Sequence, residues 1–260
     1  MSLEFGSQWL EIAVAVALFG GLLGAFELAY WAGSRVAQRA AEDAGPLGTI
    51  QGAVLGLLGL LLGFSFAGAA GRFIDRQDLI VSEANAIGTA YLRADLLDEP
   101  FRGELRTALR EYTASRVELF EAQGRGLEAV ARAEEQSAAV HPRVWQAALR
   151  GVQGAPQLAL AVLAPVNEVI DLHTTHMAAT RRHLPALVVA ILVAAAAVTL
   201  GTLGYGFGLS RQRHSVLACA VTFLVAAALW LTIDLDYPSH GLIRIGQGPM
   251  LELERNLAAP

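Results

Sequence analysis

The chain has 260 residues, of which 54% are hydrophobic and 17% are charged, and its net charge is −5. This composition, gathered into long apolar blocks, favours a membrane protein over a soluble domain. No Arg-rich stripe interleaved with aromatic residues is present, which argues against nucleic acid as a partner.

Two apolar blocks come first, at residues 9–33 and 48–71. Each reaches the length of roughly 20 residues that a helix needs to cross a bilayer. Trp9 lies at one end of the first block, and Tyr30 and Trp31 lie at the other, as is typical of a spanning helix. The polar turn between the blocks is too short for a domain. Residues 1–71 are therefore predicted to form a transmembrane hairpin.

The next segment, residues 72–183, is polar. Apolar residues recur in it at spacings of three and four, which predicts helices at residues 75–97, 101–123, 127–151 and 158–183. His141 and Pro142 predict a turn or kink within the third of these helices. We expect the first helix to continue the second span, and the last helix to continue into the third span, without a break.

Two further apolar blocks, at residues 184–208 and 216–233, predict a second transmembrane hairpin, followed by a C-terminal segment at 234–260. The predicted fold class is an all-α integral membrane protein, with four transmembrane helices and a helical layer between helices 2 and 3. Four spans place both termini and this layer on one side of the membrane.

Arginines near the membrane ends favour a cytoplasmic location for the termini and the helical layer. The short loops carry Arg35, Arg39, Arg211 and Arg213. The other side carries Arg72, Arg76, Arg93, Arg181, Arg182, Arg244 and Arg255.

Enzyme signatures are absent from the sequence: it has no phosphate loop, no nucleophile elbow, no metalloprotease helix and no paired Cys motif. We therefore do not expect an enzyme. His173 and His176 are three residues apart, with Asp171 and His183 nearby, a spacing that can bind a metal on one helix face. Because a fourth ligand is not evident, we favour a polar helix face near the lipid headgroups.

The second span carries the candidate pore residues. Small residues suited to close helix packing recur every three or four positions, at Gly52, Gly56, Gly59 and Gly63. Bulky apolar residues follow at Leu62, Phe64, Phe66 and Phe73. A ring of such side chains around a symmetry axis forms a hydrophobic constriction that gates by dewetting. The same residues also suit contacts with lipid and ordinary helix packing.

Three acidic residues at the spans are candidate ion or proton sites. Glu27 lies in the first span, where it is either a boundary carboxylate beside Tyr30 or a pore-lining or proton-sensing group. Asp234 and Asp236 follow the fourth span and could bind Ca²⁺, which prefers six to eight oxygen ligands. We favour the alternative, in which they pair with Arg72, Arg76 or Arg244.

Polar residues also occur within two helices of the middle segment that we expect to face each other. Buried polar groups need hydrogen-bond partners, so these residues predict either a hydrogen-bonded clamp or the lining of a charged vestibule. The residues are Glu83, Asn85, Arg93, Asn167 and Asp171.

The same segments carry a family resemblance. The sequences Leu-Leu-Leu-Gly-Phe-Ser-Phe at 60–66 and Glu-Ala-Asn-Ala-Ile-Gly-Thr-Ala-Tyr-Leu-Arg at 83–93 resemble a bacterial family of unknown function termed bestrophin-like. Asp-Leu-Asp-Tyr-Pro at 234–238, followed by Gly-Leu-Ile-Arg-Ile at 241–245, is similar to the same family. The resemblance covers most of the chain and implies a multi-pass protein of the bacterial inner (cytoplasmic) membrane.

A more distant resemblance, in architecture, extends to bestrophins themselves, which are pentameric anion channels with a pore lined by the second span. It implies that Phe64, Phe66 and their neighbours form a hydrophobic neck, and that Asp234 and Asp236 lie where a Ca²⁺ clasp would be. The chain lacks the long acidic run and the extended tail of eukaryotic members.

These observations lead to three hypotheses. The first is a homo-oligomeric, pentameric ion channel that conducts inorganic ions, anions by analogy, through a pore along the second span. The second is a non-conducting membrane sensor or scaffold that binds a cytoplasmic partner. The third is a cation channel, because the acidic pattern of Glu27, Asp234 and Asp236 would suit cations.

Overall fold

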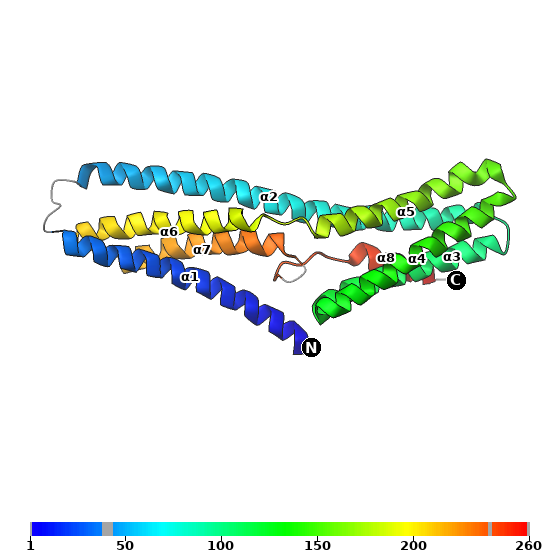
Figure 1. Cartoon of the computed structure of the whole chain (residues 1–260), viewed down its shortest axis with the longest axis horizontal. Helices are drawn as coiled ribbons and strands as arrows, with labels where there is room; N and C mark the ends of the chain where they lie inside the picture. The colour runs from blue at the N-terminus through cyan, green and yellow to red at the C-terminus, as the bar shows by residue number, and fades with distance from the viewer. Residues whose placement is uncertain (1, 38–43, 239–240, 259–260) are drawn as a thin grey trace. The chain divides into compact units, whose positions relative to one another are not determined.

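A computed structural model describes residues 2–37, 44–238 and 241–258 of the chain. Over these residues it forms eight α-helices, which confirms the predicted all-α fold class (Figure 1). They are α1 (Ser2–Val36), α2 (Ala44–Arg93), α3 (Phe101–Ala122), α4 (Leu127–Gln153), α5 (Ala159–Thr180), α6 (Ala186–Leu209), α7 (Ser215–Asp236) and α8 (Gly248–Ala258). Short 3-10 turns connect some of them, at η1 (Ala94–Leu96), η2 (Gln123–Arg125) and η3 (Pro156–Leu158).

The four predicted spans are confirmed. Helices α1, α2, α6 and α7 each contain an apolar stretch long enough to cross a membrane, with mean hydropathies of 2.1 to 2.5. Their apolar residues occur on all sides of the helix, as expected for helices whose outer faces meet lipid. Arg39, in the predicted turn between the first two spans, lies outside the described residues.

Helix α2 continues through 50 residues, so the predicted continuation of the second span is confirmed. The predicted continuation into the third span is wrong, because α5 ends at Thr180 and α6 begins at Ala186. Pro185 immediately precedes α6 and explains the break, since proline has no N–H to donate and disfavours helical conformation in the residue before it. Conversely, α4 runs through Pro142, where a turn or kink is predicted.

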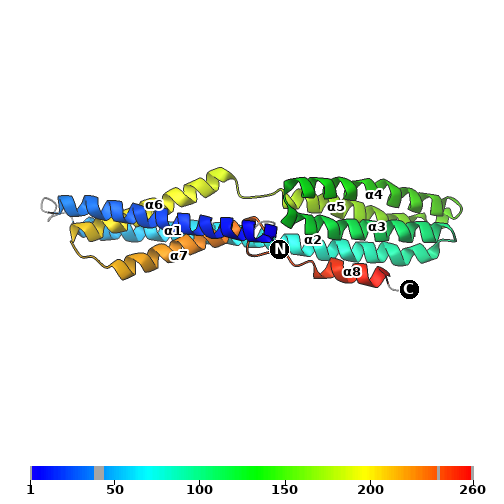
Figure 2. The same cartoon turned by 90° about the horizontal axis from the view of Figure 1, so that it is seen from below.

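The chain divides into two compact units, which we describe separately. Unit 1 comprises Met1–Glu4, Phe73–Arg182 and Arg244–Pro260. In it, α3, α4, α5 and the second part of α2 lie side by side, with α8 beside them (Figure 2). Their core is mainly aliphatic, with Tyr112 and Phe120 as its buried aromatic residues, and includes Ile87, Leu105, Leu109, Val162, Val166 and Met250. Helix α8 was not predicted, and it buries Met250 and Leu257 from one face.

Unit 2 comprises Phe5–Arg72 and His183–Ile243, and therefore contains the apolar stretches. Its core includes Leu22, Phe26, Leu58, Leu200 and Leu229. Helices α1 and α6 approach each other closely at Gly204 and Gly208, where an added Cβ would clash with the carbonyl oxygens of Phe26 and Tyr30. Small residues at such contacts allow the backbones of membrane helices to pack directly.

Candidate functional site

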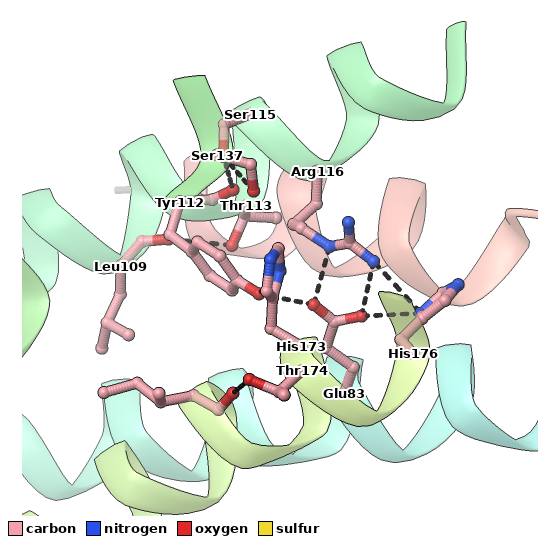
Figure 3. A network of polar contacts seen from close by, with 11 residues as sticks. Glu83, Leu109, Tyr112, Thr113, Ser115, Arg116, Ser137, His173, Thr174 and His176 are labelled. Atoms are coloured by element: carbon pink, nitrogen blue, oxygen red, sulfur yellow. Dashed lines mark hydrogen bonds and ion pairs between the residues drawn. The ribbon is translucent and has the colours of Figure 1, made fainter. Parts of the chain in front are cut away.

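The core of unit 1 contains a fully buried ion pair between Glu83 of α2 and Arg116 of α3 (Figure 3). The guanidinium donates from Nε to Glu83 Oε1 at 2.7 Å and from Nη2 to Oε2 at 2.9 Å. Both side chains are 0% exposed. This two-point geometry is the strongest form of Arg–carboxylate contact, and burial removes the competition from water.

Two further side chains complete the surroundings of the carboxylate. The Tyr112 hydroxyl donates to Glu83 Oε1 at 2.6 Å. His176 Nδ1 lies 3.1 Å from Glu83 Oε2 and 3.1 Å from Arg116 Nη2. Glu83 is thus surrounded by groups from α3 and α5, as the converging side chains in Figure 3 show.

Helical spacing brings these side chains together. Tyr112 and Arg116 are four residues apart on α3, and His173 and His176 are three apart on α5. Residues at these spacings share a helix face, so α3 presents Tyr112 and Arg116 to Glu83, while α5 presents His176 to Glu83 and His173 to Tyr112. Each helix also presents apolar residues to the surrounding core, such as Leu109.

The network fixes the charge of its two acids. Burial alone would raise the pKa of Glu83, but hydrogen bonds with His176 and the charge of Arg116 outweigh it and lower the pKa to about 2. Burial, together with the negative charge of Glu83, raises the pKa of Tyr112 well above its ordinary value. At neutral pH the carboxylate is therefore ionised and the phenol keeps its proton.

Two more histidines extend the network away from the carboxylate. His173 Nδ1 lies 3.1 Å from the Tyr112 oxygen. Because the single hydroxyl proton of Tyr112 is donated to Glu83, His173 Nδ1–H is the donor in this contact. The ring of His141, from α4, meets the ring of His173 edge-on, with centroids 4.2 Å apart.

Burial lowers the pKa of both imidazoles. For His173 it acts together with the charge of Arg116, and the pKa falls to about 4. For His141, burial is again the main cause. Both rings are therefore neutral at physiological pH.

The histidine pair of α5 differs from its sequence-based interpretation. His173 and His176 are only 8% and 3% exposed, so they do not form a polar surface at the headgroups. No group of three or more His, Cys, Asp or Glu side chains in the described part of the chain could hold a metal ion. His173 and His176 instead belong to the hydrogen-bonded network around a buried ion pair.

The predicted five-residue clamp is not assembled among the described residues. Glu83 is in the network, but Asn85 is exposed on the same helix. Asn167 donates to Asp171 at 2.7 Å, one turn further along α5. Arg93 donates to the Ala161 carbonyl at 3.3 Å.

Three residues of the network are not among the candidates predicted from the sequence: Tyr112, Arg116 and His141, of which His141 was considered only as part of a turn or kink. The spacing of Arg116 offered a signal. It lies four residues after Tyr112 and four before Phe120, within the buried stripe of α3. A charged residue at a position that periodicity assigns to the core requires a buried partner.

The pore candidates lie on the first part of α2. An added Cβ at Gly52, Gly56, Gly59 or Gly63 would meet no heavy atom of the described chain within 4 Å. Phe64 is 71% exposed and Phe66 is 40% exposed. Leu62 packs partly against the core of unit 2, and Phe73 is half-buried.

Helical spacing separates the two exposed phenylalanines. Phe66 follows Gly59 by seven residues and Gly63 by three, so it shares the face of the glycine stripe. Phe64 follows Gly63 directly and therefore lies about 100° around the helix from it.

Glu27 has an ion-pair partner within unit 2. Arg213 Nη2 lies 3.2 Å from Glu27 Oε2, and both side chains are partly exposed. The Arg213 guanidinium also lies over the ring of Tyr30, 5.7 Å from its centroid. Such a partner greatly lowers the cost of placing a carboxylate near the end of a span.

The two aspartates at the end of α7 are held by protein donors. Asp236 pairs with Arg72 at 2.7 Å, as we favoured from the sequence, and accepts a hydrogen bond from the Leu184 N–H at 2.6 Å. Asp234 accepts from the N–H groups of Leu242 and Ile243 at 2.8 and 2.9 Å. These donors use the oxygens that a Ca²⁺ ion would need.

Comparison with known proteins agrees with this architecture. A family model described as Bestrophin-like domain matches residues 20–250. No curated protein matches the chain, and no solved structure does. The matched range contains α2 to α7 in full, and with them the buried network and the aspartates of α7. The chain therefore belongs to the bestrophin-like family.

Proposed function

We propose that the protein is a homo-oligomeric ion channel in which α2 lines the pore. The observation that carries this proposal is the unoccupied glycine face of α2, at Gly52, Gly56, Gly59 and Gly63. Some glycines of unit 2 serve packing within the chain, as Gly204 does against Phe26, whereas Gly20, Gly21 and Gly24 of α1 are as open as the four glycines of α2. A small-residue face that contacts nothing in its own chain suits either the α2 helix of a neighbouring copy or a water-filled path.

The neck of this pore would be apolar. The segment 48–71 contains no ionisable residue, and it exposes Phe64 and Phe66. Repeated around a symmetry axis, such side chains would form a constriction that opens and closes by wetting. By analogy with bestrophins, the assembly is a pentamer.

Anions are the better-supported cargo. The cation-channel alternative depended on Glu27, Asp234 and Asp236. Glu27 is paired with Arg213, Asp236 is paired with Arg72, and Asp234 is bonded to backbone N–H groups. Carboxylates with such partners offer little attraction to a passing cation. The preference for anions otherwise rests on the family analogy.

The proposed location is the bacterial inner membrane, with residues 72–183 and both termini in the cytoplasm. This orientation follows the arginine distribution. It can be tested by labelling single cysteines placed at exposed positions of the two sides in intact cells, after Cys219→Ala.

Reconstitution of the purified full-length chain in planar bilayers tests the channel proposal. We expect current, with a reversal potential in a KCl gradient that follows chloride. Phe66→Ala, on the face of the glycine stripe, should change unitary conductance roughly twofold or more by widening the neck. Phe64 lies about 160° around the helix from Phe66, so Phe64→Ala should have the smaller effect. The matched control is Phe223→Ala, because Phe223 is 61% exposed on α7 and should leave conductance unchanged.

A protein that stays monomeric, or that passes no current under any ionic condition, would contradict the proposal. It would favour the sensor or scaffold alternative, which the titratable network of unit 1 supports. In that case a partner should co-purify with the wild-type chain from its native membrane.

A further inference from the structure

The histidines of unit 1 differ in the partners available to them. His176 lies 3.1 Å from a Glu83 oxygen, so a proton on it would meet a carboxylate. Among the described residues, His173 forms a hydrogen bond with the Tyr112 oxygen alone, and it faces the ring of His141. His141 Nε2 is buried and has no hydrogen-bond partner among the described residues. An additional proton on this His141–His173 pair would therefore have no acceptor within the network.

The charges around the pair are already balanced. Helix α2 contributes Glu83, α3 contributes Tyr112 and Arg116, α4 contributes His141, and α5 contributes His173 and His176. With His141 and His173 neutral, Glu83 and Arg116 contribute one negative and one positive charge. Both Glu83 oxygens accept hydrogen bonds from Arg116. The carboxylate charge is therefore already balanced and cannot also compensate a proton on the histidine pair.

We propose that the His141–His173 pair makes unit 1 a proton-operated switch, closed when both imidazoles are neutral and opened when the pair takes up a proton. The added positive charge would lie in the core next to Arg116, without a counter-ion. Burying an unpaired charge is costly, and the cost is relieved when α4 and α5 move away from Tyr112 and admit water.

The direction of the switch follows from the environment of His173. Its pKa is about 4 in the closed unit, chiefly because of burial, against an ordinary value of 6.5. An opened unit exposes the imidazole to water and binds the proton more tightly, so acid favours opening. Between pH 7.5 and pH 5, this single group shifts the open-to-closed ratio about 30-fold toward the open form.

The switch is also connected to the proposed pore through α2, and this step rests on the proposed function. Glu83 is part of α2, the same unbroken helix that carries the glycine stripe. Opening removes His176 of α5 from Glu83 and leaves that part of α2 less constrained. We expect acid to change the open probability of the channel.

Hydrogen exchange of the full-length protein in lipid nanodiscs tests the switch. Exchange of α4 and α5 amides, corrected for the intrinsic pH dependence, should rise between pH 7.5 and pH 5 in the wild type. His141→Gln/His173→Gln should abolish that rise, because a neutral amide replaces each imidazole. His214→Gln is the matched control, since His214 is exposed and outside the network, and it should behave as the wild type does.

A wild-type protein whose α4 and α5 exchange is flat with pH, or a double variant that keeps the full rise, would overturn the switch. Should the double variant fail to fold at pH 7.5, exchange of the imidazole C2 hydrogens in the wild type supplies the pKa of each histidine directly. Ordinary titration of both His141 and His173 would then overturn it.

Current recordings separate the switch from the channel. If the channel conducts and its acid response disappears in the double variant, the route to the pore is supported. If it conducts with an unchanged acid response, the switch does not act on the pore. If no variant conducts while the exchange result holds, the channel proposal fails and the switch stands.

Discussion

Arg116→Met isolates the contribution of the buried ion pair. The substitution removes the guanidinium and keeps a long apolar side chain, so the main change is the loss of positive charge beside Glu83. The carboxylate, which is 0% exposed, retains Tyr112 and His176 but loses both hydrogen bonds from Arg116. It must then remain charged without its counter-ion or bind a proton.

The expected destabilisation is large. Removing one partner of a buried ion pair costs about 3–5 kcal/mol, because the remaining charge has been taken out of water without compensation. In hydrogen exchange, the same loss of stability should raise the equilibrium constant for opening of the α3 amides by roughly two to four orders of magnitude. The acid response of Glu83 should change too, since loss of Arg116 allows its pKa to rise from about 2.

The control is Arg150→Met. Arg150 pairs with Glu104 at 2.7 Å, the same distance as the Arg116 pair, but its side chain is 50% exposed. An exposed pair contributes about 0–1 kcal/mol, so this variant should exchange nearly as the wild type does. Equal effects of the two substitutions would refute the argument that burial makes the Arg116 pair critical.

The double variant Glu83→Met/Arg116→Met sharpens the test. With both charges gone, the remaining cost is that of the Tyr112 hydroxyl, which loses its acceptor, and of His176. We expect a loss about 1–3 kcal/mol smaller than the sum of the two single losses. Simple additivity would mean that the two residues do not act as a pair.

Three other predictions concern the rest of the chain. Gly204→Leu should separate α1 from α6, because a Cβ there clashes with the Phe26 carbonyl. Its thermal stability in detergent should fall by about 2 kcal/mol or more, whereas Leu at a glycine of the α2 stripe should cost the protomer less than about 1 kcal/mol. Asp236→Asn removes the charge that pairs with Arg72 and should cost about 1–3 kcal/mol in the same assay. Burial holds the pKa of His173 at about 4, below its ordinary 6.5, so the unfolded chain binds this proton first as pH falls. The free energy of unfolding should therefore drop by up to about 3 kcal/mol between pH 6.5 and pH 4 and then level off, and His173→Gln should flatten this part of a denaturation-versus-pH profile.

The spans and most helices could be predicted because their signals are local. A crossing helix needs an apolar run of fixed length, and such a run is visible without any knowledge of tertiary contacts. The continuity of α2 was also predictable, because its apolar run passes into a three-to-four periodicity with no proline between residues 47 and 99. The break before α6 has an equally local cause in Pro185, and the prediction of a continuous helix did not take this proline into account.

The buried network could not be predicted in the same way because its contacts are distant in sequence. Arg116 is 33 residues from Glu83, and His176 is 93 residues from it. Periodicity assigns a residue to a helix face but does not say which helix packs against that face. The clamp prediction selected Glu83 correctly as a buried group but chose partners by their polarity alone.

The charged residues that were candidate ion sites from the sequence instead form ion pairs and hydrogen bonds within the chain. Glu27, Asp234 and Asp236 each accept hydrogen bonds from protein groups, and the charge of Glu83 is balanced by Arg116 inside unit 1. If α2 does line a pore, its span brings no ionisable side chain to the ions. Selection would then depend on how readily an ion gives up water at an apolar constriction, and on backbone and hydroxyl dipoles. Control of opening would have to come from outside the span, and the titratable groups around Glu83 on the same helix are suited to that role.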